Sequence, residues 1–299
     1  MEKSHLRPQD YSLEFGILMR TVPSYLNPRS TIPAEKHAEP WLIVETGDGY
    51  EISLQRGTIR ICLDRPGGNP LTLSMMRDIA VRFKKFSTDP SVRRIIVTGR
   101  GRYFCTGMDL KEDLLGSVAE RKAALDDLFA SIDNCPKLTI AVVNGPAIGG
   151  GVGIVSVCDV RLAVSSSYFC LGEVRLGLCP ATISKYLVRE LGPSLARAAM
   201  MTGRRMPSQI LYQSGFLHVL EHDMAALDKY KEEFLTDMRL PAPQASAWCK
   251  ELVRAAISAD DATANEIFTA MLGKDSESSH GVEQFRKGVK EITWEKLDR

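Results

Sequence analysis

Short apolar runs alternate with longer helical patterns over the first two thirds of the chain. Runs rich in β-branched and apolar residues, bounded by glycine, proline or charged residues, predict strands at 41–45, 50–55, 58–63, 94–98, 138–143 and 160–164. Apolar residues recurring every three or four positions predict helices between them, at 74–86, 110–133 and 152–157. Strands that alternate with helices are typical of an α/β fold.

From Pro193 onward the pattern is helical almost throughout, and no further strand is predicted. The expected helices are 193–202, 207–214, 223–237, 241–258, 260–272 and 279–296. Before the first strand, residues 1–40 mix polar residues with five prolines, which favours an irregular arm. We therefore expect three parts: the proline-rich arm 1–40, an α/β core 41–235 and a helical region 236–299.

The composition is that of an ordinary globular protein, with a net charge of +1. A nucleic-acid surface would need clustered excess lysine and arginine, so we expect no nucleic-acid partner. The seven cysteines are scattered without a C-x-x-C pair, which indicates reduced thiols in an intracellular protein. The sequence has no apolar run of membrane-spanning length, no signal-peptide pattern and no peroxisomal tripeptide at its end, so we expect a cytoplasmic location.

Two glycine-containing loops carry the candidate chemistry. Residues 103–110 and the triplet Gly149-Gly-Gly151 each follow a predicted strand and open a predicted helix. The N–H groups of such a junction lack an intrahelical acceptor and favour an anion or a developing oxyanion. The triplet does not fit the G-x-G-x-x-G pattern of dinucleotide sites, because Ile154 holds its last position. On its own, the triplet is equally consistent with close packing of a helix on a strand.

Four segments taken together resemble the enoyl-CoA hydratase/isomerase (crotonase) superfamily. They are, in order, FCTGMDLKED, NGPAIGGGVGIVSVCDVRLA, FCLGEVRLGLCPATISKYLVRELG and MMTGRRM. The resemblance covers residues 50–216 well and the helical tail more loosely. It implies the crotonase (ClpP-like) spiral of ββα units over 41–235, with two roughly perpendicular sheets wrapped by helices. It also implies that the region 236–299 makes trimer contacts, and that two trimers stack into a hexamer.

The same resemblance assigns roles to residues of the two loops. The backbone N–H groups of Met108 and Gly150 are expected to hold the thioester oxygen as it becomes an enolate oxygen. Their partner is then an acyl-CoA thioester, and no cofactor is implied beyond the CoA part of the substrate.

Residues that contact CoA are implied in the same way. Lys111 matches a family position near the CoA phosphates, and Arg65 lies in a loop that is often near the nucleotide. Backbone near Cys105 and Thr106 is expected to build the adenine pocket. An aromatic of the family's C-terminal signature can reach a CoA site, and Phe285 matches it loosely.

The carboxylates decide which reaction is expected. Family hydratases use two glutamates; the position of the first is Gly153 here, and the second is present as Glu173. Two carboxylates can position a water, whereas one can take a proton α to the thioester and return it elsewhere, as in the family's Δ3,Δ2-enoyl-CoA isomerases. Dienoyl isomerases carry a further aspartate where this chain has Ala181. A carboxyl group in an apolar pocket has a raised pKa, which suits a base acting near neutrality.

Substitutes for the missing carboxylate stay open at this point. Asp126, Asp127 and Asp133 lie on the predicted 110–133 helix, either as a stand-in or as solvated charges. Gly153 itself is expected to leave space for an anion such as bicarbonate. Asp109 is expected to cap the helix that starts there.

Glu173 also has a structural alternative, as a helix cap or as an ion-pair partner of Arg175. His218 and His222 have helical spacing for zinc, but the sequence offers no H-E-x-x-H motif or third ligand, so we expect no metal site.

Isomerisation of an unsaturated acyl-CoA with Glu173 as the acid and base is the leading interpretation. The segment GLCPATISKYLVRELG resembles methylglutaconyl-type hydratases, which favours hydration or dehydration as an alternative. Decarboxylation, which needs only the oxyanion hole, is another alternative. The alternative outside enzymology is a degenerate, CoA-binding scaffold. The acyl chain, the pathway and the role of the arm cannot be read from the sequence.

Overall fold

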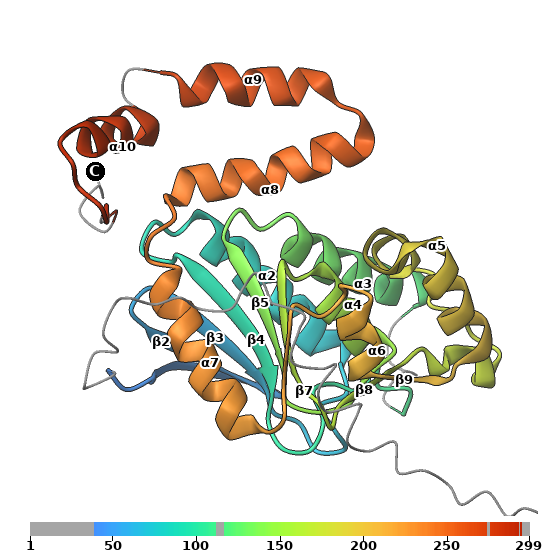
Figure 1. Ribbon diagram of the computed structural model, residues 1–299. Coiled ribbons are helices and arrows are strands. Elements are labelled where there is room, and N and C mark those ends of the chain that lie inside the picture. Colours follow the sequence, from blue (N-terminus) through green and yellow to red (C-terminus); the bar gives the residue numbers. More distant parts are fainter. Residues whose placement is uncertain (1–38, 112–116, 274–275, 293, 295–299) are drawn as a thin grey trace, which may run out of the picture.

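The computed structural model describes residues 39–111, 117–273, 276–292 and 294. The proline-rich arm predicted for 1–40 therefore lies outside the described residues, apart from its last two positions. Figure 1 shows an α/β core, with the last three helices set to one side of it. The mixed α/β architecture predicted from the alternating pattern is confirmed.

A seven-stranded sheet forms the centre of the core, in the order β1-β2-β3-β4-β5-β7-β10. Its first three strands are antiparallel, and the pairs from β3 to β10 are parallel. Because both faces of the parallel part are covered, its strands are nearly continuous apolar runs, as the sequence indicated. The strands are β1 Leu42–Gly47, β2 Tyr50–Gln55, β3 Thr58–Leu63, β4 Arg94–Gly99, β5 Leu138–Val143, β7 Val160–Val164 and β10 Val219–Glu221.

A second, three-stranded sheet lies beside the glycine triplet. It consists of β6 Ala147–Ile148, β8 Tyr168–Cys170 and β9 Arg205–Pro207, in the order β6-β8-β9. The prediction of no strand after residue 193 is wrong, because β9 and β10 both lie there. Each of these strands has only three residues, too few to show a period, and each forms by pairing with an earlier strand.

Helices surround the sheets and continue into the C-terminal region. Their bounds are α2 Leu73–Thr88, α3 Val118–Asp133, α4 Gly150–Val157, the 3-10 helix η1 Gly172–Leu176, α5 Ser184–Thr202, α6 Ser208–Gln213, α7 Met224–Asp237, α8 Pro243–Ser258, α9 Asp261–Met271 and α10 Glu277–Arg286. The predicted 110–133 helix begins only at 118. Ser117 and Glu120 form a reciprocal capping box there, which fixes the first turn.

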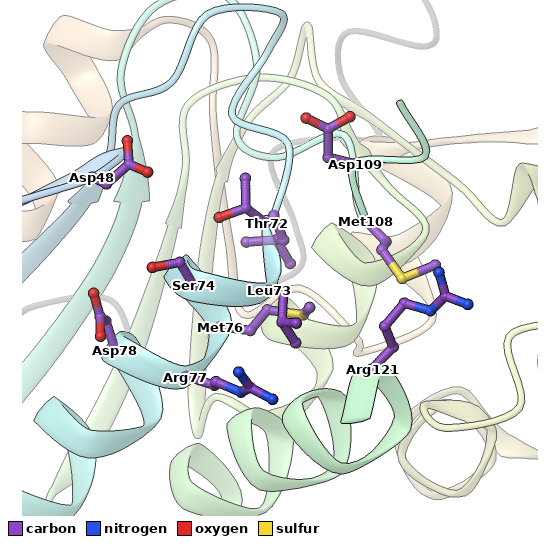
Figure 2. A pocket seen from close by; sticks show the side chains of 11 residues that line it. Asp48, Thr72, Leu73, Ser74, Met76, Arg77, Asp78, Met108, Asp109 and Arg121 are labelled. Atoms are coloured by element: carbon purple, nitrogen blue, oxygen red, sulfur yellow. The ribbon is translucent and has the colours of Figure 1, made fainter. Parts of the chain in front are cut away.

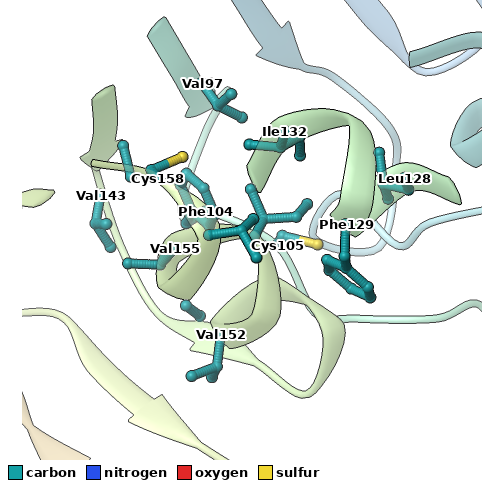
Figure 3. Close-up of a cluster of buried hydrophobic side chains, with 14 of the residues drawn as sticks. Val97, Phe104, Cys105, Leu128, Phe129, Ile132, Val143, Val152, Val155 and Cys158 are labelled. Carbon is teal, nitrogen blue, oxygen red and sulfur yellow. The ribbon is translucent and has the colours of Figure 1, made fainter. Parts of the chain in front are cut away.

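Alternate residues of each central strand face two different hydrophobic clusters. On β5, Ala141 and Val143 face the larger cluster, which includes side chains of α2, α3, α4 and α5. Ile140 and Val142 face the smaller one under α7. Figure 3 shows part of the larger cluster, where Phe129, Val152 and Cys105 gather around α4. Five of the cysteines are buried as small apolar side chains, in keeping with the expected reduced thiols.

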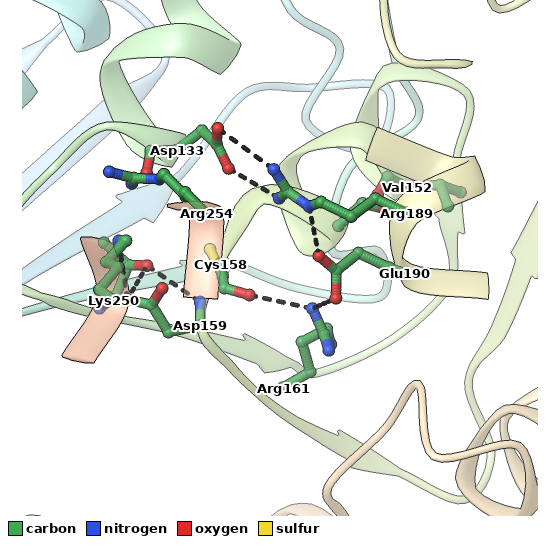
Figure 4. Close-up of polar contacts among 11 residues, drawn as sticks. Asp133, Val152, Cys158, Asp159, Arg161, Arg189, Glu190, Lys250 and Arg254 are labelled. Carbon is green, nitrogen blue, oxygen red and sulfur yellow. Dashed lines mark hydrogen bonds and ion pairs between the residues drawn. The ribbon is translucent and has the colours of Figure 1, made fainter. Parts of the chain in front are cut away.

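Ion pairs tie the helices to one another behind α4 (Figure 4). Arg189 of α5 pairs with Asp133 of α3 at 2.7 Å and with its neighbour Glu190 at 2.7 Å. Glu190 also pairs with the buried Arg161 of β7 at 3.0 Å. This chain of charges fixes the position of α5 relative to α3. Side chains of α3, and Ile183 at the N-cap of α5, line the candidate site.

The region α8–α10 leaves many apolar side chains exposed. They are Val253, Ile257, Phe268, Leu272, Val282 and Phe285. Such a band is unusual on the surface of a monomer. Within the described residues, no helix is long and apolar enough to cross a membrane.

Candidate active site

Two loops, one after β4 of the seven-stranded sheet and one after β6 of the three-stranded sheet, meet at their glycines. Gly107, in the loop after β4, has a φ of +86°, and Gly149, after β6, has a φ of +52°. A Cβ on Gly107 would lie 2.9 Å from the Ile148 carbonyl oxygen and 3.0 Å from the Gly150 nitrogen. Only glycine at position 107 lets the loops approach this closely. A Cβ on Gly150 would in turn lie 3.7 Å from the Met108 nitrogen, so the two N–H groups border one space.

Both N–H groups are left out of the surrounding backbone hydrogen bonds. Leu71 pairs on either side of Met108: it donates to the Gly107 carbonyl at 2.8 Å and accepts from the Asp109 N–H at 2.9 Å. Within the described residues, the Met108 N–H has no acceptor. Gly150 is the first residue of α4, so its N–H has no intrahelical acceptor. Two unpaired donors facing one space form a candidate oxyanion hole.

Glu173 lies beside this space, on η1 directly after β8. Its Oε1 would be 3.1 Å from a Cβ on Gly149. Its Oε2 is the one buried side-chain oxygen or nitrogen among the described residues that has no hydrogen-bond partner. Burial raises the pKa of this carboxyl group above its ordinary value. A buried carboxyl oxygen without a hydrogen bond is costly for the fold, which points to a functional role.

The structural alternatives for Glu173 have no support in the geometry. No side chain caps η1, and the residue at its N-cap is Leu171. Arg175 lies on the same short helix but packs near Gly203, where a Cβ would be 3.3 Å from its Nε.

A pocket of about 480 Å³ joins the glycine loops to Glu173. Its wall is mostly apolar, with side chains from the 106–110 loop, α3, and the segment 172–183. These include Met108, Leu110, Leu125, Phe129, Ile148, Leu176, Leu178, Pro180, Ala181 and Ile183. The pocket therefore suits an apolar acyl group with its reacting end near Glu173.

Gly153, where the family's first glutamate would lie, faces apolar side chains. A Cβ built there would be 2.5 Å from Cγ2 of Ile183 and 2.8 Å from the nearest ring atom of Phe129. The glycine is buried, as are Phe129 and Ile183. The expectation that this position leaves space for bicarbonate is therefore wrong, because the volume is already filled.

The aspartates of the predicted 110–133 helix supply no substitute. Asp126 pairs with Lys122, Asp127 pairs with Lys84 at 2.6 Å, and Asp133 takes part in the network of Figure 4. None of the three lines the pocket. They are structural charges, and the stand-in hypothesis fails.

Two of the residues expected to contact CoA, Arg65 and Lys111, contact Asp109. Arg65 forms an ion pair with the Asp109 carboxylate, and the Lys111 N–H donates to it at 3.0 Å. Among the described helices, α3 begins at Val118 with Ser117 as its N-cap, so the prediction that Asp109 caps this helix is wrong. Cys105 is buried, and its carbonyl accepts the Ile148 N–H at 2.9 Å. Thr106 lines the pocket, and its N–H donates to the Gly68 carbonyl at 3.0 Å.

A second pocket, of about 330 Å³, lies on the other side of Met108 (Figure 2). The start of α2, Asp109 and the first turn of α3 line it. Arg77 and Arg121 reach into this space, and Figure 2 shows the Met108 side chain directed toward Arg121. This pocket could not be predicted from the sequence, because the residues that line it come from segments far apart along the chain.

The histidines are engaged elsewhere. Nδ1 of His218 accepts the Arg161 N–H at 3.0 Å, and burial lowers the pKa of His218 to about 4. His222 is exposed beside Asp223. In the part of the chain that the structure describes, no three metal-binding side chains come together.

Comparison with known proteins agrees with this geometry. The model of the Enoyl-CoA hydratase/isomerase family matches residues 53–296. The chain belongs to this family. Among curated relatives, enoyl-CoA hydratase ACTT6 of Alternaria alternata is 54% identical over 256 residues, covering 84% of this chain and 86% of the relative. Enoyl-CoA hydratase AFT6-1 of the same fungus is 50% identical over 280 residues, covering 92% of each.

Solved structures of the family share the fold. Pseudomonas aeruginosa AtuE has a TM-score of 0.76 at 30% identity, covering 82% of this chain and 98% of the other. The family membership makes this protein an enzyme of the hydratase/isomerase type, and it confirms the crotonase fold inferred from the four segments.

The residues that sequence reasoning missed are Phe129 and Ile183. The sequence around each of them does not indicate a role in the site, because each is an ordinary apolar residue within a helix or at its start. Their importance comes from the contact that both make with Gly153.

Proposed function

We propose that this enzyme shifts the double bond of an enoyl-CoA, with Glu173 as both base and acid. Glu173 takes a proton from C2 of a 3-enoyl-CoA, and the C–H electrons move into the thioester as a dienolate. The Met108 and Gly150 N–H groups bind the dienolate oxygen. Glu173 then returns the proton to C4, which leaves the double bond between C2 and C3 with no net change in composition.

One observation carries this proposal. Among the described residues, Glu173 is the one carboxyl group that lines the pocket, its Oε2 has no hydrogen-bond partner, and apolar side chains fill the place of a second carboxylate. Its raised pKa brings the carboxyl group closer to the strength that a base needs near neutrality. One carboxylate is sufficient to move a proton within the substrate. Holding a water for addition to C3 normally requires a second polar group.

Hydration or dehydration is the second candidate, and the names of the relatives favour it. ACTT6 and AFT6-1 are both called enoyl-CoA hydratases, and the carnitinyl-CoA dehydratase of Proteus mirabilis is 32% identical over 209 residues. In that case Glu173 alone would position and deprotonate the water.

Incubation with 3-enoyl-CoA and 2-enoyl-CoA substrates in deuterated water, followed by mass spectrometry, separates the two candidates. Isomerisation predicts a shifted alkene, with deuterium exchanged into it and no added water. A product heavier by one water would contradict the proposal and establish hydration. A CoA complex without any conversion of the panel would favour decarboxylation or a scaffold.

We also propose that α8–α10 make the contacts of a homotrimer, with a hexamer formed from two trimers. The exposed apolar side chains of these helices support this, because a partner subunit would bury them. Light scattering coupled to size exclusion measures the mass. Replacing Phe268 and Leu272 by serine is expected to shift the mass toward the monomer. A native protein of monomeric mass would contradict the assembly.

A further inference from the structure

Phe129 and Ile183 meet over Gly153 and together close one side of the pocket. Phe129 is fully buried and Ile183 is 3% exposed, yet both also line the pocket that holds Glu173. No atom of a side chain larger than glycine fits at position 153, because the first carbon already contacts both residues at 2.5 to 2.9 Å. We refer to Phe129 and Ile183 as the plug.

The plug is held by the surrounding helices. The Phe129 ring packs on Tyr186 with 6.2 Å between the ring centroids. The Ile183 carbonyl accepts the Tyr186 and Leu187 N–H groups at 3.0 Å, which anchors it at the start of α5. The Asp133–Arg189 ion pair then fixes α5 against α3, the helix that carries Phe129. These contacts hold the plug between α3 and the start of α5.

We propose that the plug determines which reaction the pocket performs. It fills the place where a second carboxylate and its bound water would lie beside the acyl chain. A water in a buried cavity needs two or more polar partners, and the plug offers none. Among the described residues that line the pocket, Glu173 is then the one carboxyl group, and no second carboxylate holds a water against C3. This inference rests on the isomerase activity proposed above and adds two residues that specify it.

The steric part of the inference is tested by thermal unfolding of Gly153→Ala. Alanine in a helix is normally more stable than glycine, so an unobstructed site would give a higher Tm. The plug instead predicts a fall of about 5 °C, from overpacking. Ile183→Ala removes the atom at 2.5 Å, so Gly153→Ala should cost much less in that background. A rise in Tm in the native background, or an equal fall in both, would overturn the inference.

The chemical part is tested by installing the missing carboxylate. In hydration one O–H bond of water breaks, the oxygen bonds to C3 and the proton reaches C2. Gly153→Glu combined with Ile183→Ala and Phe129→Leu should bring ¹⁸O from labelled water into the product, at least tenfold above wild type. The matched control carries Gly153→Gln on the same background, with equal volume but no base. Ile132→Ala, which truncates a buried isoleucine outside the pocket, controls for general loosening.

The outcomes separate this inference from the proposed function. Wild-type enzyme that itself adds labelled water would refute the isomerase proposal, whatever the variants do. Suppose instead that wild-type enzyme isomerises, and that the folded variant with Gly153→Glu, Ile183→Ala and Phe129→Leu isomerises and adds no water. This result would refute the role of the plug alone. Equal ¹⁸O uptake by the Gly153→Gln control would also refute it, because the carboxylate would not matter.

Discussion

The two sides of the pocket are built from neighbouring stretches of the chain but differ in chemistry. On one side, Met108 and Gly150 present unpaired N–H groups to the pocket that also holds Glu173, whose buried Oε2 has no hydrogen-bond partner. On the other, Phe129 and Ile183 present only carbon. The first side carries a cost in stability that catalysis can explain, whereas the second is packed like any protein core. Among the described residues, apolar packing and not another charge therefore takes the place of the missing glutamate.

The largest effect on the polar side is expected from Glu173→Gln. This change keeps the volume of the side chain and removes the base, so turnover should fall by about 10² to 10⁴. CoA affinity, measured by calorimetry, should stay within about threefold of wild type. Glu283→Gln, on an exposed residue of α10, is the matched control and should leave turnover unchanged. Unchanged turnover of Glu173→Gln would point to the scaffold alternative.

A smaller effect is expected from disturbing the oxyanion hole through Gly107→Ala. The added carbon would lie 3.0 Å from the Gly150 nitrogen and would push the two N–H groups apart, so kcat should fall by about 10². Gly101→Ala is the control, because its φ of +79° imposes a similar backbone strain with no atom within 4 Å of the new carbon. If both variants lose activity equally, strain explains the loss and the oxyanion geometry does not.

On the apolar side, the ion pair that fixes the plug can be weakened. Asp133→Ala leaves the half-buried Arg189 with one carboxylate instead of two, and we expect a loss of about 2 kcal/mol in the free energy of unfolding. Asp126→Ala breaks an exposed pair on the same helix and should cost less than about 0.5 kcal/mol. Urea unfolding measures both. Equal costs would mean that the network of Figure 4 does not hold α5 in place.

The polar side of the pocket could be predicted from the sequence, and the apolar side could not. Met108, Gly150 and Glu173 lie within motifs whose spacing indicates their chemistry, and the structure brings them together as expected. Gly153 could be recognised from the sequence as a departure from the hydratase pattern. Which side chains fill the space next to it, however, depends on how α3 and α5 pack. Asp109 was misassigned for a related reason: its partner Arg65 is 44 positions away, so local pattern favoured a helix cap.

The short strands show the same limit. Strands β2, β3, β5 and β7 have the predicted bounds, because their apolar runs are long enough to be read locally. Strands β9 and β10 have three residues each and form by pairing with β8 and β7, respectively. The pattern of apolar residues therefore predicts strands whose own sequence is long and apolar enough to be recognised. It misses short strands that form only by pairing with distant parts of the chain.

The smallest predicted effect compares the stabilities of wild-type enzyme and Glu173→Gln across pH. Burial raises the pKa of Glu173 in the folded state, so the folded enzyme binds this proton more tightly than the unfolded chain does. Ionisation therefore destabilises the fold, and the stability is lost as pH rises above the unfolded pKa and through the folded one. Glutamine is neutral at every pH, like the protonated acid, so the Glu173→Gln variant does not lose this stability as pH rises.

At pH 7 the Glu173→Gln variant should thus have a Tm about 2 °C or more above that of wild type, although it is inactive. Below the ordinary glutamate pKa of about 4.3, both side chains are neutral and the difference should vanish. Differential scanning calorimetry at several pH values measures this. A variant that is less stable at pH 7 would mean that the carboxylate is well solvated or paired in the folded enzyme, and the raised pKa would then not be available to catalysis.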